Sequence, residues 1–152
     1  VGFTNYSYFS RSFKQAFNQL PSQYGGGIKM LNSMDEKFLS DVTRVINDNI
    51  SSPKFNAGVL SKKLLIGRTT LYRRLFSLTN QTPASFIRTL RLKRARQLLC
   101  SESRSIISVA FEVGFCSASY FSRCFKQEYG CLPSEYKTAE QTKGRKYGEK
   151  EE

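Results

Sequence analysis

The spacing of apolar residues predicts a chain of short amphipathic helices. Apolar residues recur every three or four positions, which is the spacing that buries one face of an α-helix. The longest stripe follows Ser33-Met34-Asp35-Glu36, which has the S-x-x-E pattern of a helix-capping box. Asn56, Thr82 and Ser117 are further candidate N-caps. We expect an all-α protein of about seven helices, at residues 33–50, 56–65, 68–79, 83–100, 105–113, 117–129 and 133–139, with an additional helix at residues 5–18.

One stretch of the sequence occurs more than once. Residues 1–24 repeat residues 113–136 with 15 of 24 positions identical. A weaker copy, at residues 63–86, lies 50 residues before residues 113–136 and keeps mainly their apolar positions. In that copy Leu65, Leu71, Leu75, Pro83 and Phe86 stand for Phe115, Phe121, Phe125, Pro133 and Tyr136, and Arg73 stands for Arg123. Because internal repeats mark structural units, we take this stretch to be the functional unit.

The repeated stretch predicts two helix-turn-helix subdomains. In each, two short helices are separated by a tight turn that contains glycine, which is the pattern of this motif. The helix at residues 83–100 lies between them and has apolar residues on more than one side, as expected if each end packs against a different subdomain. Its length of ~27 Å compares with the ~34–36 Å between helix-turn-helix half-sites on DNA. We therefore expect recognition helices in successive major grooves.

The same pattern suggests the domain boundaries. Residues 1–24 form a partial repeat of the second helix-turn-helix, residues 25–32 a glycine-rich joint, and residues 33–140 the main domain. Within that domain we expect a first subdomain (33–82), a linker helix (83–100) and a second subdomain (101–140). Residues 141–152 are a charged tail that we expect to be disordered. The partial repeat lacks its own scaffold helix, so we expect its apolar face to dock on the main domain or to mediate self-association.

The charge distribution indicates a polyanionic partner. The net charge is +12, and the residues from Lys54 to Arg104 include 12 basic residues and one acidic residue, Glu102. A basic block of this size favours nucleic acid or an anionic membrane surface. No apolar run approaches the ~20 residues of a membrane span. Histidine is absent and the four cysteines have no zinc-ligand spacing, so we expect no metal, no cofactor and no enzymatic activity.

Residues 35–137 resemble the DNA-binding domain of the AraC/XylS family of bacterial transcription regulators. The motifs that carry the resemblance are Leu71-Tyr72-Arg73-Arg74-Leu75, FIRTLRLKRARQLL at residues 86–99, Val113-Gly114-Phe115, Tyr120-Phe121-Ser122-Arg123, Phe125-Lys126 and Pro133-Ser134-Glu135-Tyr136. Residues 71–99 also resemble the output domains of hybrid two-component regulators in Bacteroides-type bacteria. The resemblance implies a cytoplasmic regulator of transcription, usually an activator that contacts RNA polymerase, with its regulatory domain upstream of this chain.

The resemblance also implies the residues that contact double-stranded promoter DNA. Base-reading positions are Arg68, Thr69, Tyr72 and Arg73 in the first subdomain and Ala118, Ser119, Ser122 and Arg123 in the second. Arginine can bind guanine bidentately, whereas Ala118 and Ser119 are short, so the second subdomain is expected to read less sequence. Phosphate-binding positions are Lys62, Lys63, Arg74, Thr82, Arg88, Lys93, Ser117 and Lys126.

Several alternatives stay open at this stage. Tyr72 is also consistent with a packing residue, and Arg91 and Arg94 with either phosphate contacts or internal ion pairs. The competing function is nonspecific binding of nucleic acid or an anionic membrane through the basic block at residues 54–104. Such binding would weaken steeply with salt and discriminate little between sequences.

Overall fold

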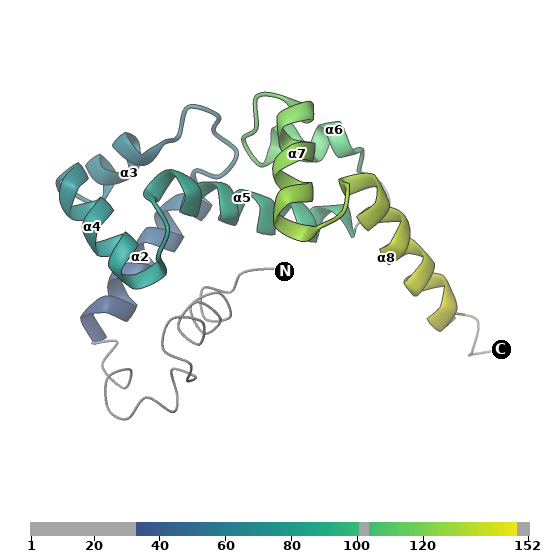
Figure 1. Cartoon of the computed structure of the whole chain (residues 1–152), viewed down its shortest axis with the longest axis horizontal. Helices are drawn as coiled ribbons and strands as arrows, with labels where there is room; N and C mark the ends of the chain where they lie inside the picture. Colours follow the sequence, from purple (N-terminus) through teal and green to yellow (C-terminus); the bar gives the residue numbers. More distant parts are fainter. Residues whose placement is uncertain (1–32, 101–103, 149–152) are drawn as a thin grey trace. The chain divides into compact units, whose positions relative to one another are not determined.

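The computed structural model describes residues 33–100 and 104–148, with side chains as far as Thr142. These residues form seven helices: α2 (Ser33–Asp48), α3 (Ala57–Lys63), α4 (Arg68–Thr79), α5 (Pro83–Leu99), α6 (Ile106–Glu112), α7 (Ala118–Tyr129) and α8 (Pro133–Gly148) (Figure 1). The expected all-α fold is therefore confirmed. The predicted helix at residues 5–18 and the joint at residues 25–32 lie outside the described residues. Within the described ranges, no helix is long and apolar enough to cross a membrane.

Side-chain caps explain why the helices begin where they do. The Asn56 side chain accepts hydrogen bonds from the backbone N–H groups of Gly58 and Val59, at 2.9 and 3.1 Å. Ser117 accepts one from the Tyr120 N–H at 3.2 Å. These bonds satisfy donors that the first helical turn leaves without a partner. The starts predicted from these residues are confirmed.

The last helix is longer than the sequence pattern predicted. We expected it to end near Ala139 and the charged tail to be disordered, but α8 continues to Gly148. The added turns contain no proline and are rich in residues with good helix propensity. The hydroxyls of Thr138 and Thr142 donate to the carbonyls four residues earlier, at 3.0 and 2.9 Å, so the helix also satisfies them.

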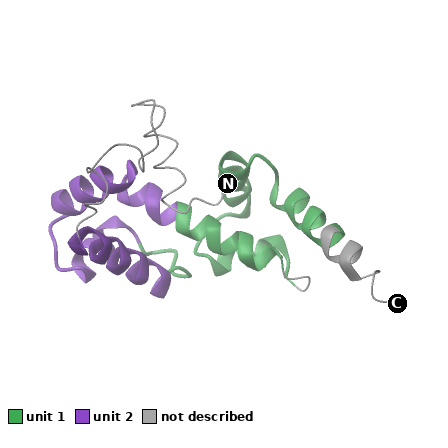
Figure 2. Ribbon diagram, turned by 90° about the horizontal axis from the view of Figure 1, so that it is seen from below, with its two compact units in different colours: residues 1, 50–55, 89–152 green, residues 2–49, 56–88 purple. Residues whose placement is uncertain are grey.

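The described residues divide into two compact units (Figure 2). The N-terminal unit comprises residues 33–49 and 56–88, where α3 packs against both α2 and α4. Its helices bury apolar side chains at helical spacing, as the sequence pattern predicted. The buried apolar side chains of this unit are Phe38, Val42, Ile46, Leu60, Leu71, Leu75, Phe86 and Ile87.

The C-terminal unit comprises residues 50–55, 89–100 and 104–148. Its core is contributed by α5, α6, α7 and the turn before α7, and contains Leu92, Ala95, Leu99, Val109, Ala110, Val113, Phe115, Phe121, Cys124 and Phe125. The ring of Phe121 meets that of Phe115 edge-on, with centroids 5.2 Å apart. Helix α5 therefore buries one set of side chains in each unit, which explains why its apolar residues do not share a single side.

Candidate nucleic-acid interface

Helix α4 presents one polar and aromatic face to solvent. Leu71 and Leu75 anchor its opposite face, with exposed fractions of 1% and 0%. The four residues predicted to read bases are all exposed: Arg68, Thr69, Tyr72 and Arg73. At about 100° per residue, these four positions fall within an arc of about 140°. The structure therefore brings them together on one surface of α4.

Helix α7 has the equivalent arrangement in the C-terminal unit. Phe121 and Phe125 anchor it in the core, while Ser119 and Arg123 are exposed. Ala118 and Ser122, also predicted to read bases, are half-buried beside them. Of the eight predicted base-reading positions, six are therefore exposed, and the two half-buried ones are both on α7.

Tyr120, the neighbour of the buried Phe121, lies largely outside the core of the C-terminal unit. Its side chain is 45% exposed, and its ring lies 5.9 Å from that of Phe115, measured between centroids. On a helical wheel Tyr120 is about 100° from Phe121, which places it at the edge of the buried face.

The residues predicted to bind phosphate lie mostly at helix ends and on exposed surface. Lys62, Lys63, Arg88 and Lys126 are exposed, and Lys93 is half-buried. Thr82 and Ser117 are bound to backbone N–H groups at the first turns of α5 and α7. Partial positive charge at helix N-termini favours anions, so the two caps are compatible with nearby phosphates.

Arg74 is held inside the N-terminal unit. Its guanidinium donates to the Asp35 carboxylate at 3.1 Å and to the Met34 carbonyl at 3.2 Å. The same group lies over the Phe38 ring, 4.3 Å from its centroid. Arg74 therefore ties α4 to the start of α2, and a phosphate contact by this residue stays a prediction. Arg74 and Asp35 are 39 positions apart, so the sequence carried no local signal for this pairing.

Arg91 has a structural role that the sequence left open. Its guanidinium donates to the backbone carbonyls of Ser52 and Phe55, at 2.7 and 3.3 Å. Burial lowers the pKa of Arg91 from its ordinary value. The group also lies against Gly114, where an added Cβ would be 3.0 Å from the Arg91 side chain and 2.4 Å from the Ile50 carbonyl oxygen. Arg91 thus joins residues 50–55 to the turn between α6 and α7.

The two helix-turn-helix turns differ by one residue. Residues 64–67 join α3 to α4, whereas residues 113–117 join α6 to α7. The Ile66 N–H donates to the Ser61 carbonyl, as the Phe115 N–H donates to that of Ala110. Ile66 is therefore the counterpart of Phe115, and the earlier matching of Leu65 with Phe115 is wrong.

Leu65 instead takes the place of Gly114. Both have left-handed backbone, with φ of +56° at Leu65 and +84° at Gly114. This conformation costs a side chain with a Cβ about 1–2 kcal/mol. Leu65 is 92% exposed, whereas Gly114 lies against Ile50 and Arg91 with no room for a Cβ. At this position of the turn, the surrounding atoms therefore require glycine in the C-terminal unit, where it is Gly114, but not in the N-terminal unit, where it is Leu65.

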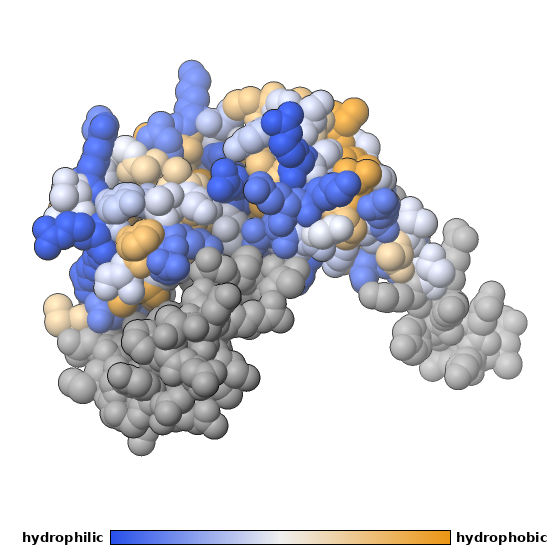
Figure 3. All heavy atoms as spheres, viewed as in Figure 1, coloured by the Kyte–Doolittle hydropathy of each residue, from blue (hydrophilic) through white to orange (hydrophobic). Residues whose placement is uncertain are grey.

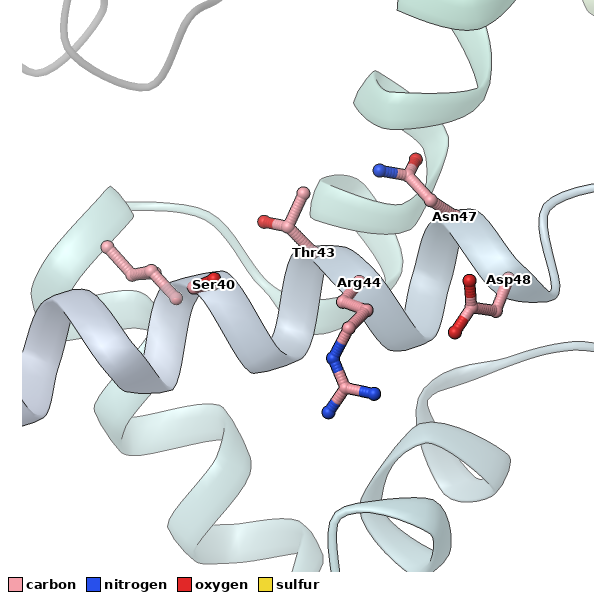
Figure 4. Close-up of a pocket in the computed structure, with 6 residues that line it drawn as sticks. Ser40, Thr43, Arg44, Asn47 and Asp48 are labelled. Atoms are coloured by element: carbon pink, nitrogen blue, oxygen red, sulfur yellow. The ribbon is translucent and has the colours of Figure 1, made fainter.

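The described surface outside the two predicted recognition helices includes a hollow along α2. On the face seen in Figure 3, hydrophilic side chains predominate and hydrophobic ones lie among them. A shallow hollow of about 500 Å³ follows α2 and is lined by Leu39, Ser40, Thr43, Arg44, Asn47 and Asp48 (Figure 4). Within this helix, Arg44 forms an ion pair with Asp41, at 3.2 Å. In the described part of the chain, no three potential metal ligands cluster.

Comparison with known proteins places the chain in a family. Residues 60–139, more than half of the chain, match the family described as "Helix-turn-helix domain". The regulatory protein SoxS of Escherichia coli K12 is 31% identical over 102 residues, which cover 67% of this chain and 94% of SoxS. Histidine kinase P4 of Formosa agariphila is 38% identical over 106 residues, which cover 70% of this chain and 8% of that kinase. The chain thus spans less than a tenth of this much longer relative.

Solved structures agree with this assignment. A transcriptional regulator from Chromobacterium violaceum, described among AraC-type DNA-binding domain-containing proteins, has a TM-score of 0.66 at 25% identity, covering 72% of this chain and 96% of its own. The DNA-binding domain of the transcriptional factor AdpA, solved in complex with a target DNA, has a TM-score of 0.64 at 27% identity, covering 69% and 94%. The chain belongs to the AraC-type family of helix-turn-helix domains.

Proposed function

We propose that this chain binds promoter DNA sequence-specifically as the DNA-binding part of a transcription regulator. The observation that carries the proposal is the pair Arg73 and Arg123, which occupy equivalent, exposed positions on α4 and α7. Each is flanked on its helix by a hydroxyl-bearing residue one turn earlier, Thr69 or Ser119. Two similar recognition helices in one chain suit an asymmetric DNA site, with α4 and α7 contacting bases in successive major grooves.

The chemistry of these surfaces suits DNA. An exposed arginine can donate two parallel hydrogen bonds to guanine O6 and N7, and serine or threonine can bond to several base edges. The lysines at the end of α3 and Lys126 on α7 supply positive charge for phosphate contacts, which fix register without reading sequence. Ala118 and the half-buried Ser122 offer shorter reach, so we propose that α7 reads fewer base pairs than α4.

Selection from random DNA tests this proposal. The full chain, incubated with a randomised duplex library at physiological salt, should enrich a motif with two blocks about one helical turn apart. Binding to the enriched duplex should exceed binding to a scrambled one by at least ~10³-fold. Equal affinity for both duplexes, with a steep salt dependence, would instead support the nonspecific alternative. Co-sedimentation with anionic vesicles in the absence of tight DNA binding would support a membrane role.

We further propose that the chain is the output domain of a larger bacterial two-component regulator that acts in the cytoplasm. The similarity to histidine kinase P4, of which the matched region is a small part, supports this idea. Activation through contact with RNA polymerase is part of the proposal. It predicts that the chain stimulates transcription by purified polymerase from a promoter carrying the selected site, and that a promoter with a scrambled site does not respond.

Self-association through residues 1–24 is a separate proposal. Seven residues of the stretch 113–136 are buried, and six of them recur unchanged in residues 1–24, with Ser12 in place of Cys124. The copied apolar positions therefore suit contact with a second chain. Sedimentation equilibrium should show a concentration-dependent dimer that is lost in a Phe9→Ser, Phe13→Ser variant. A monomer at every concentration would contradict self-association.

A further inference from the structure

Two aromatic rings lie stacked on the exposed face of α4. The Tyr72 and Phe76 rings are nearly parallel, with an interplanar angle of 3° and centroids 5.8 Å apart. Their side chains are 46% and 42% exposed, so neither is accounted for by the core of the unit. Less than half of each side chain remains exposed, and a partner that covers this apolar area would gain free energy from burying it. The Tyr72–Phe76 pair is therefore an ordered, partly exposed aromatic surface that a partner can contact.

The position of Phe76 places it within the candidate DNA-reading face. On a helical wheel Phe76 lies about 40° from Tyr72 and about 60° from Arg73, between the two. In α7 the equivalent positions hold Ser122 and Lys126, so the stacked aromatic pair distinguishes α4 from its repeat. An apolar pair next to an exposed arginine suits a partner with two adjacent features. One is an apolar group that covers the rings, and the other is an anionic or hydrogen-bond-accepting group that binds the arginine.

We infer that Tyr72 and Phe76 together contact the C5-methyl group of a thymine in the major groove, an inference that rests on the proposed function. Thymine is the only base that presents a methyl group there. Neighbouring phosphates and base edges would meet the adjacent Arg73. The stack also restrains the Tyr72 side chain before binding, which reduces the conformational entropy lost on forming the complex. Phe76 thereby becomes a specificity-determining residue on α4.

Replacement of thymine by deoxyuridine tests this inference, because it removes only the methyl group. Each thymine of the selected site is replaced in turn, and affinity is measured by fluorescence anisotropy. At one position the unaltered chain should lose about fourfold in affinity, the value expected for one buried methyl group. Phe76→Ala and Tyr72→Ala should bind both duplexes equally, whereas Tyr72→Phe, which keeps the ring, should retain the fourfold preference.

Phe111→Ala provides the matched control. Phe111 is 51% exposed, similar to Phe76, but it lies on α6 rather than on a predicted recognition helix. This variant should keep the thymine preference. The inference is overturned if no position distinguishes thymine from deoxyuridine, or if Phe76→Ala retains the preference. It is also overturned if Phe76→Ala leaves DNA binding unchanged but abolishes transcription, since the pair would then bind protein. Failure to enrich any site would refute the proposed function instead.

Discussion

Removal of the Arg91 side chain should destabilise the C-terminal unit. The Arg91 guanidinium donates to two backbone carbonyls of the segment between α2 and α3, at 2.7 and 3.3 Å. Hydrogen bonds from a charged donor contribute about 1.5–3 kcal/mol each. The longer bond is beyond the usual N–H···O range, so we count it at a fraction of that value. Because the carbonyls regain water in the variant, we expect Arg91→Ala to cost about 2–3 kcal/mol.

Urea denaturation followed by circular dichroism measures this loss directly. For a unit of this size, each kcal/mol corresponds to about 4–8 °C in Tm, so thermal unfolding should shift by roughly 10–20 °C. The stability of Arg91→Lys should lie between those of the unaltered chain and Arg91→Ala, because an ammonium group can reach one carbonyl but lacks the planar fork of the guanidinium.

Arg94→Ala is the control for charge and helix propensity. Arg94 is exposed on the same helix, and its guanidinium donates to the nearby Gln97 side chain at 3.3 Å. Its replacement should change the unfolding free energy by no more than about 0.5 kcal/mol. If Arg91→Ala were as mild as Arg94→Ala, the carbonyl contacts would contribute nothing and the structural role of Arg91 would be refuted.

Three further predictions follow from single positions. Gly114→Ala should lower the free energy of unfolding by about 3 kcal/mol or more, because left-handed strain adds to a 2.4 Å contact between the new Cβ and the Ile50 carbonyl oxygen. Gly130→Ala, with open space around the new Cβ, should lower it by about 1 kcal/mol. Equal losses in urea unfolding would contradict the steric requirement for glycine at position 114. Leu65→Gly should raise stability by up to about 1 kcal/mol by relieving left-handed strain, and a loss would show that the exposed side chain contributes. Burial raises the pKa of Tyr129 to about 12, above the ~10 of an unfolded chain. The contribution of Tyr129 to stability should therefore be constant below pH ~10 and fall by about 1–2 kcal/mol as pH rises to ~12. Tyr129→Phe should reduce the alkaline loss of stability by that amount, while burial also raises the pKa of Tyr136 and leaves a further loss in both proteins; an unchanged alkaline profile would refute the prediction.

Local sequence signals predicted the helices well. The start of α3 followed from the Asn56 cap, and α4 spans the predicted residues 68–79. These features depend on side chains close in sequence, so periodicity and capping chemistry are enough to locate them. The end of α8 was missed because mixed charged residues are compatible with both a helix and a disordered tail.

Features that depend on tertiary packing could not be predicted. The contacts of Arg91 join residues 36 or more positions apart in the sequence, and their acceptors are backbone carbonyls, which leave no trace in residue types. The register of the first turn was misjudged because apolar identity favoured Leu65, whereas the backbone hydrogen bonds match Ile66 with Phe115. Phe76 did carry a signal, since helical periodicity already places it away from Leu71 and Leu75.

The exposed arginines on α4 and α7 provide the most direct test of two readers in one chain. The selected motif is determined again for Arg73→Ala and for Arg123→Ala, each compared with the unaltered chain. Each variant should lose about 1–3 kcal/mol of discrimination at one base pair, and the two affected positions should lie about one helical turn apart. A uniform loss of affinity across all sequences in both variants would show that these arginines contact phosphate, and would contradict sequence reading by two helices.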